Sequence, residues 1–92
     1  MAKPLSTSVP LKRKKLSVAG LVQGVGFRPF VYRLAQKHHL AGWVRNTSRG
    51  VDIEVEGAPA DLDLFIDGLS KEAPSLARVD KVVSRDTPPL AQ

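Results

Sequence analysis

A glycine-containing segment between residues 22 and 28 has the residue types of an anion-binding site. Two glycines and Arg28 lie where an apolar run ending at Val22 gives way to a helical pattern beginning at Phe27. Backbone N–H groups at the start of a helix point outward, and the helix dipole favours a negative charge there. The planar guanidinium of an arginine binds two oxygens of a phosphate or carboxylate at once. The segment therefore predicts a phosphate-like ligand, and the alternative is a tight turn that merely needs glycine.

Several other kinds of site are excluded by the sequence. A dinucleotide fingerprint needs a third glycine where Pro29 stands, and a P-loop needs Gly-Lys followed by Ser or Thr. The chain has no cysteine, which excludes a disulfide framework, a thiolate zinc site and a cysteine nucleophile. His38 and His39 lack a third ligand nearby and suit a helix end better than a metal site. We therefore expect neither a metal nor a cofactor.

The surrounding pattern predicts the elements that position this segment. Leu16 to Val22 is expected to form an inner strand buried on both faces. Apolar residues at three- and four-residue spacing predict a helix from Phe27 to His38. Pro29 is tolerated only in a first helical turn, so this helix must begin near Phe27 or Arg28. Such a start places Arg28 at the positive end of the helix dipole.

The rest of the chain predicts two hairpin strands, a second helix and a final strand. Trp43 to Asn46 is expected to be a strand, residues 47–50 a hairpin loop, and Val51 to Glu56 a half-buried strand with strict alternation. An apolar stripe from Leu62 to Leu69 predicts the second helix, and Arg78 to Ser84 predicts the last strand. The order β-α-β-β-α-β predicts an α+β, ferredoxin-like fold, with two helices on one face of an antiparallel sheet.

The positive charge of the chain is concentrated near its N-terminus. The 92 residues carry a net charge of +5, and residues 1–15 contain five Lys or Arg and no acid. We therefore predict a basic flexible tail at residues 1–15 and one domain at residues 16–92. A tail that binds nucleic acid is the alternative to a solvated leader. No apolar run approaches the ~20 residues of a membrane span, and the N-terminus lacks a secretory signal, so a cytoplasmic location without a membrane partner is expected.

Two motifs resemble the signatures of the acylphosphatase family. The first covers residues 20–28 (GLVQGVGFR) and the second covers residues 42–50 (GWVRNTSRG). The continuation at residues 28–35 (RPFVYRLA) is similar to the N-terminal acylphosphatase-like domain of the hydrogenase-maturation carbamoyltransferases HypF. The resemblance covers about residues 16 to 85, and the two motifs occur in the expected order on the expected βαββαβ pattern.

The resemblance implies metal-independent hydrolysis of an acyl phosphate to a carboxylate and inorganic phosphate. It implies that Arg28 and backbone amides hold the phosphoryl group and that Asn46 positions the attacking water. In the longer HypF chains it implies carbamoyl phosphate as a substrate and further maturation domains on the C-terminal side. The implied phosphate ligands are the backbone groups of Gln23, Gly24, Val25, Gly26, Phe27 and Arg28.

The residue types fit this chemistry, and each assignment has an alternative. A mixed anhydride releases a carboxylate that needs no proton from the enzyme, so neither a histidine base nor a metal is required. The alternatives are an Arg28 that neutralises an acidic helix neighbour and an Asn46 that only forms a turn. A non-catalytic domain that binds carbamoyl phosphate or docks to other modules is the second reading of function. An RNA-binding module is disfavoured, because residues 51–56 carry no aromatic side chain and several acids.

The C-terminal end departs from the family pattern. Acylphosphatase-like domains usually end with a short strand after the segment that matches Arg78–Arg85. Here residues 88–92 (PPLAQ) show no apolar alternation, so we expect the last strand to be missing or the chain to be a fragment. An exposed sheet edge would then promote self-association.

Overall fold

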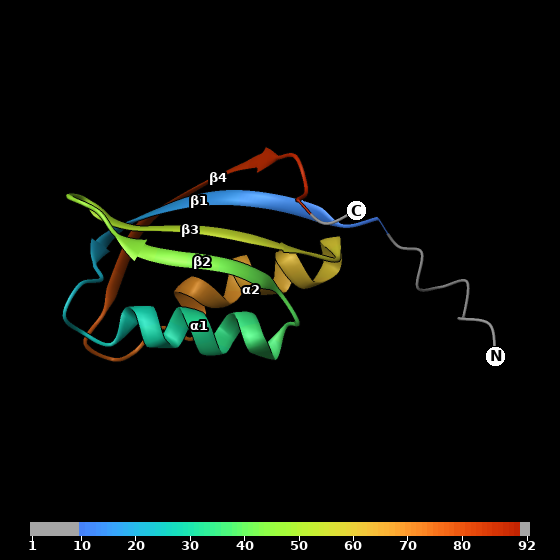
Figure 1. Cartoon of the computed structure of the whole chain (residues 1–92). Helices are drawn as coiled ribbons and strands as arrows, with labels where there is room; N and C mark the ends of the chain where they lie inside the picture. The colour runs from blue at the N-terminus through green and yellow to red at the C-terminus, as the bar shows by residue number, and fades with distance from the viewer. Residues whose placement is uncertain (1–9, 91–92) are drawn as a thin grey trace.

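Two helices cover one face of a four-stranded antiparallel sheet and leave the other face open (Figure 1). This computed structural model describes residues 10–90. Its sheet order, β2-β3-β1-β4, makes β1 and β3 inner strands and confirms the predicted ferredoxin-like βαββαβ fold. The elements are β1 (Lys12–Leu21), α1 (Phe27–Lys37), β2 (Ala41–Asn46), β3 (Gly50–Gly57), α2 (Pro59–Lys71) and β4 (Arg78–Thr87).

The apolar core lies between the helices and the covered face of the sheet. β3 alternates as predicted, with Val51, Ile53 and Val55 buried toward the helices. The rings of Phe27 and Phe30 lie 5.5 Å apart and fix the first turn of α1 to the core. No helix in the described part of the chain is long and apolar enough to cross a membrane. The buried apolar residues are Leu16, Val18, Val22, Phe27, Phe30, Val31, Leu34, Val51, Ile53, Val55, Leu62, Phe65 and Leu69.

The first strand corrects two predictions. β1 begins at Lys12, so residues 12–15 belong to the sheet and not to the predicted basic tail. Residues 10 and 11 are exposed, and the rest of that predicted tail, residues 1–9, lies outside the described residues. Burial of β1 on both faces is also wrong, because Leu16 and Val18 face the helices while Ser17 is exposed on the open face. The helices lie on one side of the sheet only, so one face of the strand remains polar.

Acidic side chains of β3 explain why basic residues enter a strand. Arg13 is only 6% exposed, and its guanidinium donates hydrogen bonds to the carboxylates of Glu54 and Glu56, the latter at 3.1 Å. Burial acts to lower the pKa of Arg13, but the hydrogen bonds and charges of the two glutamates outweigh it, so this pKa lies above its ordinary value. The N–H of Leu90 donates to Glu56 Oε1 at 2.7 Å. Glu56 therefore contacts both β1 and the segment that follows β4.

The last strand is longer than predicted. β4 extends past Ser84 to Thr87, and Lys14 on β1 donates a hydrogen bond to Asp86 at 2.8 Å. That hydrogen bond lowers the pKa of the Asp86 carboxyl below its ordinary value. Within the described residues no strand follows Thr87, and residues 91 and 92 lie outside them. The edges of the described sheet are therefore β2 and β4.

Candidate active site

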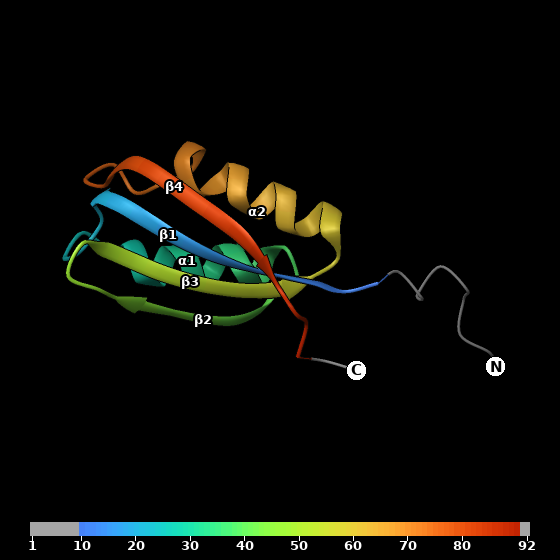
Figure 2. The same cartoon turned by 90° about the horizontal axis from the view of Figure 1, so that it is seen from above.

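The loop between β1 and α1 lies at the same end of the sheet as the turn between β2 and β3 (Figure 2). We call residues 23–28 the glycine loop. Gly24 and Gly26 have φ angles of 74° and 80°, in the left-handed region that favours glycine. A Cβ atom on either residue would meet nothing within 4 Å. The two glycines are therefore needed for the path of the backbone and not for space around it.

Helix α1 begins at Phe27, as the position of Pro29 predicts, and its N-terminus has no cap from a described side chain. The N–H groups of the first turn of a helix have no partner within the helix. The first turn contains no acidic residue, and the N-cap residue, Gly26, has no side chain to accept a hydrogen bond. Backbone donors and the positive end of the helix dipole are thus available to an anion at this end of α1.

Arg28 is exposed next to these donors. Among the described residues, none makes an ion pair or hydrogen bond with its guanidinium, and α1 contains no acidic residue. The alternative in which Arg28 neutralises an acidic helix neighbour is therefore wrong. Arg28 lines an open cleft of about 350 Å³, and the other residues that line it are Pro29, Tyr32, Arg33 and Val44.

The side chain of Gln23 connects the glycine loop to the β2–β3 turn. Its Nε2 donates hydrogen bonds to the carbonyl oxygens of Thr47 at 2.5 Å and Gly50 at 2.8 Å. Thr47 directly follows Asn46, so these bonds hold the predicted phosphate loop beside the end of β2. The family motif predicts only a backbone role for Gln23. An amide side chain with two donor hydrogens next to a glycine turn is the sequence feature from which this contact could have been predicted.

The β2–β3 turn is formed by Thr47 and Gly50, and Asn46 is not required for it. The Thr47 N–H donates to the Gly50 oxygen at 2.9 Å, and Thr47 Oγ1 accepts from the N–H groups of Arg49 and Gly50 at 3.2 and 3.1 Å. Asn46 ends β2 opposite Val51, is exposed, and has no side-chain hydrogen bond to the described residues. Its amide is therefore free to bind a water molecule.

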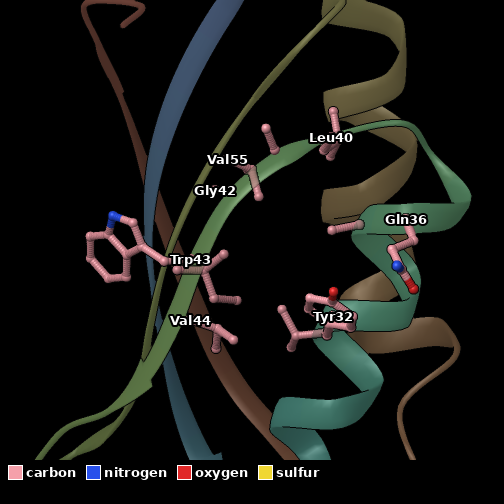
Figure 3. A pocket seen from close by; sticks show the side chains of 11 residues that line it. Tyr32, Gln36, Leu40, Gly42, Trp43, Val44 and Val55 are labelled. Atoms are coloured by element: carbon pink, nitrogen blue, oxygen red, sulfur yellow. The ribbon is translucent and has the colours of Figure 1, made fainter.

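A second cavity, of about 390 Å³, lies between α1 and β2. Figure 3 shows Tyr32 and Gln36 on its α1 side, while the ring of Trp43 points away from α1. The Trp43 ring packs on the open face, with the Arg45 guanidinium carbon 5.1 Å from its centre. Neither Arg28 nor Asn46 lines this cavity. No local sequence pattern predicts this cavity, because a helix and a strand that are separate in the chain form its walls.

Titratable groups near the site do not assemble into a metal centre. In residues 10–90 no three or more His, Cys, Asp or Glu side chains gather closely enough to hold an ion. His38 is the C-cap residue of α1, and its N–H donates to the Leu34 oxygen at 3.2 Å. The placement of His38 at a helix end is thus as predicted. The chemistry available at the site comes from backbone donors, one guanidinium and one amide.

The chain matches a known protein family over most of its length. The acylphosphatase family model matches residues 14–92. The chain therefore belongs to the acylphosphatase family. Acylphosphatase from Leuconostoc mesenteroides is 44% identical over 79 residues, which cover 85% of this chain and 88% of that protein. The crystal structure of acylphosphatase from Bacillus subtilis matches with a TM-score of 0.78 and 36% identity, covering 88% of this chain and 89% of the other.

Within the family, the chain is also similar to one end of much longer proteins. Carbamoyltransferase HypF2 of Cupriavidus necator is 57% identical over 70 residues, which cover 76% of this chain and 9% of that protein. The structure of full-length HypF in its phosphate- and nucleotide-bound form matches with a TM-score of 0.82 and 42% identity, covering 85% of this chain and 10% of the other. The chain thus spans about 9% of the length of the curated carbamoyltransferases that it matches. Both parts of the predicted resemblance are confirmed.

Proposed function

We propose that the chain hydrolyses acyl phosphates without a metal at the site formed by the glycine loop and Asn46. The observation that carries the proposal is the pair of hydrogen bonds from Gln23 to the β2–β3 turn. They join the anion-binding start of α1 to the strand end that bears Asn46. The acylphosphatase homologues, which match over most of their length, support the same activity.

The glycine loop binds the phosphoryl group in this proposal. Backbone N–H groups at the uncapped start of α1 donate to phosphoryl oxygens, and the Arg28 guanidinium binds two oxygens side by side. Charge on these oxygens changes as the acyl oxygen departs, and donors held in place stabilise that distribution without rearranging. Because Arg28 has no described ionic partner, it need not break a protein contact to bind the substrate.

Asn46 positions the attacking water. Its side-chain oxygen accepts one hydrogen from the water, which leaves an oxygen lone pair directed at phosphorus. A new bond forms between the water oxygen and phosphorus, and the bond between phosphorus and the acyl oxygen breaks. The carboxylate departs with the electron pair of the broken bond, and the protons of the water pass to phosphate and solvent. A carboxylate is a weak base, so no general acid is needed for its departure.

The longer relatives extend the proposal to carbamoyl phosphate. The matching curated proteins are named carbamoyltransferases, and this chain is similar to about a tenth of their length. We propose carbamoyl phosphate as a substrate, with carbamate as the released carboxylate, and partner domains of a hydrogenase-maturation enzyme in the longer proteins. We also propose that the reaction takes place in the cytoplasm.

Phosphate release from acetyl, benzoyl and carbamoyl phosphate tests the activity. Arg28→Ala is expected to lower kcat/KM by about 10²- to 10³-fold, because it removes donors that stabilise the transition state. Asn46→Ala is expected to lower kcat by about 10²-fold with little change in phosphate affinity, because it misplaces the water. Circular dichroism establishes that each variant is folded, and Arg78→Ala controls for the loss of one exposed cation.

Two results would contradict parts of the proposal. A folded wild type that binds phosphate but releases none from the three substrates would support the alternative of a non-catalytic carbamoyl-phosphate-binding or docking domain. Activity that is lost on adding a chelator and restored by a divalent ion would contradict the metal-independent mechanism. Retention of full activity in both Arg28→Ala and Asn46→Ala would place the reaction elsewhere on the molecule.

A further inference from the structure

Helix α1 carries two cations that have no described partner. Of its three positively charged residues, Lys37 forms an ion pair with Glu72 on the segment after α2, with 3.2 Å between Nζ and Oε1. Arg28 and Arg33 are exposed, and no described residue forms an ion pair or hydrogen bond with either guanidinium. The helix contains no acid that could compensate them. The helix therefore carries more unpaired positive charge than one phosphate-binding arginine requires.

Arg28 and Arg33 line the same cleft. The cleft of about 350 Å³ is bounded by Arg28 and Arg33 from α1 and by Val44 from β2. Tyr32 lies between the two arginines in the sequence, also lines the cleft and is 62% exposed. At about 30 Å³ per water, this space equals roughly twelve waters, which is enough for a phosphoryl group and a short acyl chain.

The positions of the arginines suit a substrate with two anionic groups. Residues five apart on an α-helix are separated by about 7.5 Å along its axis and by about 140° around it, so Arg28 and Arg33 leave α1 on either side of Tyr32. In the monophosphate of a four-carbon dicarboxylic acid, about five bonds of roughly 1.5 Å separate phosphorus from the distal carboxyl carbon, an extended span of roughly 6 Å. A phosphoryl group held at Arg28 would therefore bring that distal carboxylate within reach of the long Arg33 side chain.

We propose that Arg33 forms a second anion subsite that favours acyl phosphates whose acyl group carries its own carboxylate. This inference rests on the proposed function, because it takes the phosphoryl group to be held by the glycine loop and Arg28. Arg33 acts as a specificity residue that pairs with the distal carboxylate and takes no part in bond breaking. Substrates with an uncharged acyl group, such as acetyl phosphate, do not reach it.

Binding of two stable phosphonates separates the two sites. Butylphosphonate offers only the phosphoryl-like group, and 5-phosphonopentanoate adds a carboxylate to the same skeleton, five bonds from phosphorus. By titration calorimetry, wild type is expected to bind 5-phosphonopentanoate about five- to tenfold more tightly than butylphosphonate. Arg33→Gln should abolish that preference and leave butylphosphonate affinity within twofold. Lys37→Gln, which removes the same charge from the far end of α1, should keep the preference.

Kinetics give a second readout of the same subsite. Arg33→Gln is expected to raise KM for monosuccinyl phosphate about five- to tenfold, with kcat and the acetyl phosphate constants within twofold of wild type. Arg33→Lys, which keeps the charge, should restore part of the lost affinity. Equal affinities of wild type for the two phosphonates would overturn the Arg33 subsite and leave the phosphate site intact. Failure to bind either phosphonate would overturn the proposed phosphate site and the subsite with it.

Discussion

At the scale of single residues, Gln23 determines whether the two halves of the site meet. Its amide crosses from the glycine loop to the carbonyl groups of Thr47 and Gly50. The proposed phosphate-binding groups belong to the β1–α1 loop, and Asn46 belongs to β2. Without this contact, the distance between a phosphorus held by the loop and a water held by Asn46 would depend on two independent loops. Catalysis by positioning is sensitive to shifts of about 1 Å, so we expect this contact to affect turnover.

Gln23→Leu tests this positioning role. The variant loses the two hydrogen bonds that the Gln23 amide donates to the carbonyl oxygens of Thr47 and Gly50. This loss should lower the free energy of unfolding by about 1 to 2 kcal/mol. We expect kcat to fall about tenfold or more, and phosphate affinity to fall less, because the start of α1 keeps its donors. Denaturant unfolding and steady-state kinetics measure the two effects. Gln36→Leu, on α1, is the matched control, because no described residue forms a hydrogen bond with the Gln36 side chain. Equal kcat values in the two variants would contradict the role of Gln23.

At the scale of elements, the two helices begin in different ways that suit different roles. Gly26 precedes α1 in a left-handed conformation, with φ 80°, whereas Ala58 precedes α2 in an extended conformation, with φ −67° and ψ 143°. Neither residue supplies a side-chain cap. At α1 this leaves donors for a ligand. At α2, which lies away from the glycine loop, the missing cap serves no ligand in the proposed mechanism.

Ala58→Ser should therefore stabilise the protein without changing its activity. The extended backbone of Ala58 is the conformation that an N-cap serine needs to accept a hydrogen bond from the first turn of α2. We expect the free energy of unfolding to rise by about 0.5 to 1 kcal/mol, measured by denaturant unfolding. Ala60→Ser places the same side chain inside the helix, where serine forms helix less readily than alanine. An Ala58→Ser variant no more stable than Ala60→Ser would contradict this account.

At the scale of the whole molecule, the two faces of the sheet are held by different forces. The covered face is joined to both helices by apolar side chains. The open face carries charged pairs between neighbouring strands, and the most buried of them joins Arg13 on β1 to Glu54 and Glu56 on β3. Because these strands are the inner pair, the cluster links the two halves of the sheet.

Arg13→Met tests the importance of this cluster. Methionine replaces the apolar stem of arginine but leaves two glutamates close together without their shared cation. We expect the free energy of unfolding to fall by about 1 to 3 kcal/mol, measured by denaturant unfolding near neutral pH. Lys71→Met removes an exposed pair with Asp67 on α2 and should cost about 0.5 kcal/mol or less. Equal losses in both variants would show that the Arg13 cluster is no stronger than a surface pair.

The open edges of the sheet also concern the whole molecule. β4 carries several charged residues along its length, whereas Arg45 is the one charged residue of β2. Charged side chains protect an edge strand against pairing with another chain, so β2 is the less protected of the two described edges. Self-association through an exposed edge remains a prediction, and sedimentation velocity at increasing protein concentration would measure it.

The fold and the first turn of α1 could be predicted from the sequence alone, because both depend on local patterns. Alternation in residues 51–56 predicts one buried face of β3, and Pro29 fixes the start of α1 within one turn. These signals need no knowledge of distant residues. The two family motifs are equally local, and they predict the glycine loop and Asn46 as site residues without any knowledge of their positions in space.

The contacts between residues far apart in the chain could not be predicted from the sequence, because long-range packing creates them. Residues 12–15 have the composition of a solvated tail, and they form a strand because Glu54 and Glu56 neutralise Arg13 from 41 and 43 residues away. In the same way, Gln23 meets the β2–β3 turn, and Arg33 lines the cleft of Arg28, only after β2 packs beside α1. A local pattern reports the periodicity of one element. Long-range packing determines which residues form ion pairs and hydrogen bonds with a given residue, and the periodicity of one element gives no information about that packing.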